Sequence, residues 1–329
     1  MKLSFCMIVR DEAQFIEDCL ESVRHYVDEC VIVDTGSTDG TREIAAGAAD
    51  ILIDFEWISD FSAARNAGLD AVTGDWVLML DADERVASDE FASIRQAISS
   101  DHADGYYLTA RNYLNEQASG WIPVEEGDRM ARGFSGYTIH QTMKLFRSRP
   151  EIRFRGRIHE IVDDSIDDSR RDKLPVVVHH YTNANDARPK RERALSYLKI
   201  MEEELAEQED ARLLAIAGNT LLVFTEDYQK AARYLHRAGQ LGYRPAECLE
   251  QEAEARYRGG EFGPALDLYR SVYRNGVRTP AICLNMANLF ARSGDKARAA
   301  ELLRECLQLG GVGTEMDQVI RSNLNYLES

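Results

Sequence analysis

The chain has 329 residues, of which 44% are hydrophobic and 29% are charged, a composition typical of folded globular proteins. Its 39 basic and 56 acidic residues give a formal net charge of −17. This charge argues against general binding to nucleic acid or anionic membranes. The sequence contains no run of about 18 apolar residues, the length that a membrane-spanning helix requires. Its six cysteines lack metal-binding spacing, so we expect reduced thiols in a cytoplasmic protein.

The first 80 residues alternate short β-branched runs with amphipathic stretches. Residues 3–9 form the first run, and the apolar residues that follow recur every three or four positions, the period of a helix. Further runs lie at 30–33, 51–53 and 76–80. This alternation predicts an α/β domain with a mostly parallel sheet and helices on both faces. Ligands bind beyond the carboxyl ends of the strands in such sheets.

The C-terminal part repeats with a period of 34 residues. Four columns show this period: Asp227, Glu261 and Asp295; Ala231, Ala265 and Ala299; Leu235, Tyr269 and Leu303; Gly242, Gly276 and Gly310. This period, with a small residue at a fixed helix position, is the signature of tetratricopeptide (TPR) repeats. We therefore predict a first domain over 1–188, a connecting helix over 189–210, and about three all-α repeats with a capping helix over 211–329.

Two aspartates follow the predicted strand at 76–80. Asp81 and Asp83 are separated by Ala82, so in an extended segment both carboxylates face the same way and can converge on one divalent cation. Such a cation would bridge the phosphates of a nucleotide and stabilise a leaving diphosphate. The alternative is a pair of solvated turn aspartates that cap the next helix.

Two further candidate residues lie near the ends of other elements. Asp34 ends a strand run before a turn rich in Gly, Ser and Thr, and its carboxylate could accept a hydrogen bond from a base or a ribose. Arg65 lies early in a predicted helix and could reach a uracil carbonyl or a phosphate. A plain strand–turn–helix connection and an exposed arginine are the alternatives.

In this order, these clusters closely resemble the inverting family 2 glycosyltransferases, which have the nucleotide-sugar-binding GT-A fold. The matching segments are CMIVRDE (6–12), VIVDTGSTD (31–39), FSAARN (61–66) and LDADE (80–84), followed by weaker matches at 144–146, 156–160 and 179–181. The chain looks most similar to small glycosyltransferases that carry TPR repeats behind the catalytic domain. Some members of that subgroup glycosylate peptides on cysteine or serine, and others serve cell-envelope glycans.

The resemblance implies roles for individual residues. Asp34 would contact the uracil or ribose, Arg65 the base, and Asp81 the ribose and diphosphate. The nucleotide-sugar site would comprise Val9, Asp34, Arg65, Asp81 and Ala82.

A divalent cation, Mn²⁺ or Mg²⁺, is also implied by the resemblance. Asp83 would hold it, and His180 lies where related GT-A enzymes place a further metal ligand. Imidazole is a suitable ligand for Mn²⁺. A structural role for His180 is the alternative.

An inverting transfer needs one base, which takes the proton of the attacking acceptor group. Glu160 is our first candidate, because the match at 156–160 places it near the acceptor face. An ion pair of Glu160 with Arg155 or Arg157 is the structural alternative. The rival candidates for the base, in a stretch punctuated by glycine, are Glu125, Glu126 and Asp128.

We therefore expect a metal-dependent inverting glycosyltransferase of the hexosyltransferase type, which moves a single sugar from a UDP-sugar to a peptide, a protein or a cell-envelope glycan. The repeats are expected to bind a protein partner or to form a homodimer. Two other classes stay open. One is a repeat-based binding scaffold with an inactive GT-A domain, and the other is a sugar-nucleotide nucleotidyltransferase.

Overall fold

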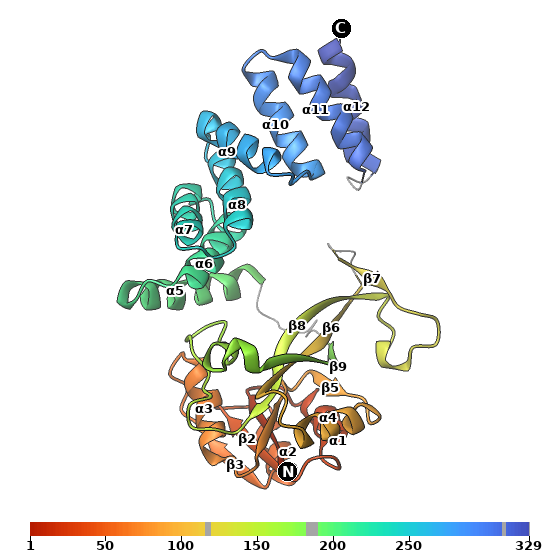
Figure 1. Cartoon of the computed structure of the whole chain (residues 1–329), viewed down its shortest axis with the longest axis vertical. Coiled ribbons are helices and arrows are strands. Elements are labelled where there is room, and N and C mark those ends of the chain that lie inside the picture. The colour runs from red at the N-terminus through yellow and green to blue at the C-terminus, as the bar shows by residue number, and fades with distance from the viewer. Residues whose placement is uncertain (116–119, 182–189, 311–313, 329) are drawn as a thin grey trace. The chain divides into compact units, whose positions relative to one another are not determined.

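The computed structural model describes residues 1–115, 120–181, 190–310 and 314–328. The chain forms two compact units, Met1–Ala187 and Arg188–Ser329 (Figure 1). The strands of the first unit are β1 (Leu3–Val9), β2 (Glu29–Asp34), β3 (Ile51–Asp54), β4 (Trp76–Met79), β5 (Glu84–Val86), β6 (Gly105–Leu114), β7 (Ile122–Pro123), β8 (Gly136–Arg147) and β9 (Arg171–Tyr181). Its α-helices are α1 (Ile16–Val23), α2 (Thr41–Ala48), α3 (Phe61–Ala71) and α4 (Glu90–Ser99).

A single sheet organises this unit, with the strand order β3-β2-β1-β4-β8-β6-β9-β5 and β7 paired to β8. The first four strands in this order are parallel to one another. Strand β8 runs antiparallel to both β4 and β6, whereas β9 is parallel to β6. The α/β architecture expected from the strand–helix alternation is confirmed, and the antiparallel strand β8 joins its two halves.

Helices cover both faces of the central strands, which explains their continuous apolar sequence. Every residue of β2 and β4 is buried. On β1, Phe5 and Met7 belong to the core under α1 and α4, whereas Cys6 belongs to a second core on the other face. Helix α3 lies against β1 and β2 on that second face. Gly68 permits this close approach, because a Cβ atom there would lie 2.6 Å from the Cys6 sulfur.

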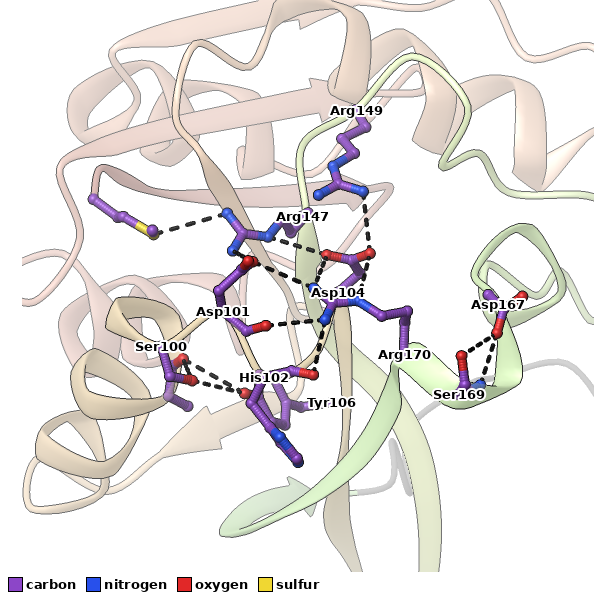
Figure 2. A network of polar contacts seen from close by, with 12 residues as sticks. Ser100, Asp101, His102, Asp104, Tyr106, Arg147, Arg149, Asp167, Ser169 and Arg170 are labelled. Atoms are coloured by element: carbon purple, nitrogen blue, oxygen red, sulfur yellow. Dashed lines mark hydrogen bonds and ion pairs between the residues drawn. The ribbon is translucent and has the colours of Figure 1, made fainter.

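A cluster of charged side chains joins β6, β8 and β9 (Figure 2). Asp104, directly before β6, is buried and accepts hydrogen bonds from Arg147 on β8 (3.2 Å), from Arg149 (3.1 Å) and from Arg170 before β9 (3.1 and 3.2 Å). The hydrogen bond from Arg170 and the charges of the other arginines lower the pKa of Asp104, although partial burial opposes this shift. The cluster therefore ties together three strand ends that are distant in sequence.

The second unit consists of helices throughout its described residues. These are α5 (Lys190–Glu207), α6 (Ala211–Phe224), α7 (Tyr228–Gln240), α8 (Pro245–Arg258), α9 (Phe262–Arg274), α10 (Pro280–Arg292), α11 (Lys296–Leu309) and α12 (Thr314–Glu328). None of the helices in the described part of either unit combines the length and the apolar character needed to cross a membrane.

The 34-residue columns occupy equivalent places in three successive helix pairs. Ala231, Ala265 and Ala299 are fully buried near the start of the second helix of each pair. Gly242 and Gly276 follow the ends of α7 and α9 with φ angles of 88° and 87°, a conformation that favours glycine. The expectation of an all-α region of TPR type is confirmed.

Candidate active site

Asp34 ends β2 beside Val9, its register partner at the end of β1. It is 2% exposed, and its Oδ1 atom accepts hydrogen bonds from the backbone N–H groups of Gly36 (2.9 Å) and Ser37 (2.8 Å). Its Oδ2 atom is also buried but accepts no hydrogen bond from any residue that the structure describes. A buried oxygen of this kind carries a desolvation cost that a ligand donor would relieve. The Val9 carbonyl already accepts a hydrogen bond from the N–H of Thr35 at 3.0 Å.

Arg65 connects two acidic residues from distant parts of the chain. It lies in α3, whose first turn is capped by Asp60 through the N–H of Ala63. Arg65 is 8% exposed, and it donates from Nη2 to Oδ1 of Asp81 (2.9 Å) and from Nε to Oε1 of Glu160 (2.7 Å). The alternative of an exposed arginine is therefore wrong.

A loop hydrogen-bonded to α3 brings Glu160 to Arg65. Gly156 has a φ of 92°, and its carbonyl accepts a hydrogen bond from the Ser62 hydroxyl at 2.6 Å. The Arg157 carbonyl accepts another from the N–H of Phe61 at 2.9 Å. Among the ion pairs of the described residues, Glu160 is joined to Arg65, and not to either of the two arginines near it in sequence.

Lys144, on β8, lies in the weaker family match at 144–146, which assigns it no role. Its ammonium donates to Oδ2 of Asp81 (3.2 Å) and to Oε2 of Glu84 (2.6 Å), and both Lys144 and Glu84 are buried. Both carboxylate oxygens of Asp81 therefore contact a cation. Partial burial acts to raise the pKa of Asp81, but the charges of Arg65 and Lys144 hold it well below its usual range. Burial raises the pKa of Glu84.

Ala82, between the two aspartates, is 4% exposed and belongs to the main core. The buried Ala82 side chain holds the segment that follows β4 in place, and with it the backbone of Asp81 and Asp83 on either side. The neighbouring backbone is held as well, because the Asp83 carbonyl accepts a hydrogen bond from the N–H of Tyr181 at 3.0 Å.

Asp83 and His180 face each other across the β5–β9 pairing. The Nε2 atom of His180 lies 3.1 Å from Oδ2 of Asp83, and its Nδ1 atom lies 2.6 Å from Oδ1 of Asn112 on β6. Burial lowers the pKa of His180, but the hydrogen bond and charge of Asp83 outweigh it and raise the pKa overall. Within the described ranges, no three side chains of His, Cys, Asp or Glu converge on a metal position.

The rival base candidates lie elsewhere. Glu125, Glu126 and Asp128 line a cavity of about 480 Å³ together with Arg111 and His179. Arg111 and His179 are register partners on β6 and β9, and side chains alternate between the two faces of a strand. The cavity therefore lies on the opposite face of the sheet from Asn112 and His180.

Comparison with known proteins gives this site its context. The glycosyl transferase family 2 model matches residues 4–154 of the chain. A TPR repeat-containing protein of Synechococcus elongatus is 32% identical over 323 residues, which cover 93% of this chain and 75% of that protein. The SPbeta prophage-derived glycosyltransferase SunS of Bacillus subtilis is 26% identical over 156 residues, covering 47% of this chain and 33% of SunS.

Among solved structures, S. aureus TarS in complex with UDP-GlcNAc is similar with a TM-score of 0.48 and 16% identity, covering 84% of this chain and 92% of that one. The similarity to the Synechococcus protein extends through both units of the chain, whereas the family model covers most of the unit that carries Asp34, Arg65, Asp81 and Asp83. The chain belongs to glycosyl transferase family 2.

Proposed function

We propose that this chain is a metal-dependent inverting glycosyltransferase that moves one sugar from a UDP-sugar to an acceptor. The observation that carries the proposal is the set of polar groups beyond the carboxyl ends of β2 and β4. These are the buried, unsatisfied oxygen of Asp34, the contact of Arg65 with Asp81, and the facing pair of Asp83 and His180. This is the edge at which open α/β sheets bind ligands.

The donor nucleotide would use three of these residues. Oδ2 of Asp34 would accept a hydrogen bond from the uracil N–H or a ribose hydroxyl. The N–H groups of the following turn donate to Oδ1 of this carboxylate and leave Oδ2 without a donor among the described residues. The guanidinium of Arg65 would lie toward the base. Asp81, whose side chain is 38% exposed, would face the ribose and diphosphate, with its orientation held from both sides by Arg65 and Lys144.

Asp83 and His180 fit a divalent cation. A carboxylate oxygen and an imidazole nitrogen are ligand types that Mn²⁺ accepts, and here they face each other at 3.1 Å. Mg²⁺ would depend more on the oxygen ligands. The cation, when bound, would neutralise the charge that develops on the leaving diphosphate.

Glu160 would act as the base. The acceptor oxygen or sulfur attacks the anomeric carbon, and its proton passes to the Glu160 carboxylate as the bond from carbon to phosphate oxygen breaks and UDP leaves with the electron pair. The contact with Arg65 supports this role, because it joins Glu160 to Asp81. For the acceptor we propose a peptide or protein, since helical repeats offer extended binding surfaces; a cell-envelope glycan is the alternative.

The test is UDP release from a panel of UDP-sugars with Mn²⁺, with Mg²⁺ and with a chelator. We expect metal-dependent release from one sugar, faster when the acceptor is present. Release that is equally fast with the chelator would contradict the metal requirement. Failure of every UDP-sugar to bind would contradict the donor class and leave the repeat-based scaffold as the better interpretation.

A further inference from the structure

Four polar side chains form a continuous chain of contacts across the sheet. Asp83 follows β4, His180 lies on β9, Asn112 on β6 and His140 on β8. The Asp83 Oδ2 to His180 Nε2 distance is 3.1 Å, the His180 Nδ1 to Asn112 Oδ1 distance is 2.6 Å, and the Asn112 Nδ2 to His140 Nδ1 distance is 2.8 Å. Asn112 therefore links the two histidines.

The strand register explains why these residues meet. Asn112 is the direct partner of His180 in the parallel β6–β9 pair, and it is the direct partner of Thr138 in the antiparallel β6–β8 pair. His140 lies two residues beyond Thr138, on the same face, within the diagonal reach of a long side chain. Asn112, His140 and His180 thus share one face of the sheet.

The donor and acceptor types fix the proton on His180. The Oδ1 atom of Asn112 only accepts, so Nδ1 of His180 is the donor in that contact. The Nδ2 atom of Asn112 only donates, so Nδ1 of His140 accepts in the second contact. In the neutral tautomer with its proton on Nδ1, His180 presents a lone pair on Nε2 toward Oδ2 of Asp83. Two such atoms 3.1 Å apart are held favourably only with a cation or a proton between them.

We propose that Asn112 is the positioning residue for a cation held by Asp83 and His180, and that His140 fixes the orientation of the Asn112 amide. This inference rests on the proposed function, because it assumes the cation. Asn112 does not contact the cation. It directs the His180 ring and its tautomer, as hydrogen-bonding partners of metal-bound histidines generally do.

The test is a titration of the full chain with Mn²⁺, with and without UDP. The electron paramagnetic resonance signal of the free ion reports how much Mn²⁺ stays unbound at each step. Asn112→Leu removes the amide and is expected to weaken Mn²⁺ binding 10- to 100-fold, the usual range for such partners. The matched control is Gln141→Leu. Gln141 on β8 donates to Thr109 on β6 at 2.8 Å, so it joins the same two strands outside this chain of contacts.

A second readout needs no metal and no activity. In ¹⁵N-histidine spectra of the metal-free protein, which has seven histidines, the Nδ1–H group of His180 is expected to be protected from exchange by its hydrogen bond to Asn112, and Asn112→Leu is expected to abolish this protection. If Asn112→Leu fails to fold, His140→Phe at an exposed position serves instead, with an expected loss of Mn²⁺ affinity of up to about tenfold.

The outcomes separate this inference from the proposed function. If Asp83→Asn leaves Mn²⁺ binding unchanged, or the wild-type chain does not bind Mn²⁺ even with UDP, the cation site itself is wrong. If Asp83→Asn abolishes binding while Asn112→Leu and His140→Phe bind Mn²⁺ as the wild type does, the site stands and the positioning role is overturned. A loss of Mn²⁺ affinity in Gln141→Leu equal to that in Asn112→Leu would also overturn the positioning role of Asn112.

Discussion

Arg65 donates from Nε to Oε1 of Glu160 at 2.7 Å, although 95 residues separate the two in sequence. The same guanidinium donates to Asp81. One buried cation thus fixes the proposed base relative to the proposed donor site. Replacing Arg65 would disturb both donor binding and proton transfer, whereas replacing Glu160 would test proton transfer alone.

Glu160→Gln is expected to lower the rate of transfer by about 10²- to 10⁴-fold, the usual contribution of a general base, with little change in UDP affinity. The amide keeps the size of the carboxylate but cannot take the acceptor proton. Transfer rates and UDP titrations check this together. Glu151→Gln, at an exposed position nine residues earlier, is the control, and full transfer by Glu160→Gln would reject Glu160 as the base.

Asp34→Asn is expected to weaken UDP binding by about 10- to 100-fold, because a hydrogen bond to a charged group contributes about 1.5 to 3 kcal/mol. Calorimetric titration with UDP measures the change. Asp54→Asn is the matched control. Asp54 is the register partner of Asp34 at the end of β3, but it is exposed and binds Arg42. Equal affinities in the two variants would remove Asp34 from the nucleotide site.

Lys144→Met is expected to destabilise the N-terminal unit by about 3 to 5 kcal/mol, because it leaves the buried carboxylate of Glu84 and that of Asp81 without their shared cation. Adding Glu84→Gln to this variant should recover part of the loss. The chain's three tryptophans, Trp57, Trp76 and Trp121, all lie in this unit, so their fluorescence in urea reports its unfolding. Lys173→Met, at an exposed position on β9, should change stability little; a loss as large as that of Lys144→Met would argue against the shared-cation role.

Asp104→Asn is expected to lower the unfolding free energy by about 2 kcal/mol at neutral pH, since it removes charge-assisted hydrogen bonds from three arginines. The folded state depresses the pKa of Asp104. Its stabilising effect is therefore complete above the unfolded-state pKa of about 4 and is lost as the pH falls through the lower folded-state value.

The difference between Asp104→Asn and the wild type should accordingly be constant from pH 7 to about pH 5 and shrink below about pH 4. Urea unfolding at several pH values measures it. Asp101→Asn is the control from the same cluster. Asp101 contacts Arg147 and Arg170, but its side chain is 83% exposed, so it should contribute little. A difference that stayed constant at low pH would show that Asp104 is not acting through its charge.

Sequence patterns predicted the parts of the fold that are local. The apolar runs gave the parallel strands, and the 34-residue period gave the paired helices, because each depends on residues close together in the chain. Because Asp34, Asp81 and Asp83 come at or just after the ends of predicted strands, the sequence also predicts that they lie at the carboxyl edge of the sheet. Their roles in binding remain predictions.

The partners of these residues could not be predicted in the same way. Lys144 reaches the site through the β4–β8 pairing. Asn112 reaches it through the pairing of β6 with β8 and β9, and the register of β6 shifts near Tyr107 with both of these neighbours. No local pattern encodes such a shift. Closeness in sequence favours Arg155 or Arg157 as the partner of Glu160, but the loop that bends back to α3 brings Arg65 instead.

The adjacent histidines of β9 show how closely this site depends on strand register. A slip of one residue exchanges the two faces of a strand, so it would bring His179 to the place of His180 and still offer an imidazole to Asp83. The slip would also remove Tyr181 from its stack on Tyr113, where the ring centroids lie 5.2 Å apart. Insertions and deletions before β9 are thus opposed by aromatic packing, even where they would conserve the ligand type.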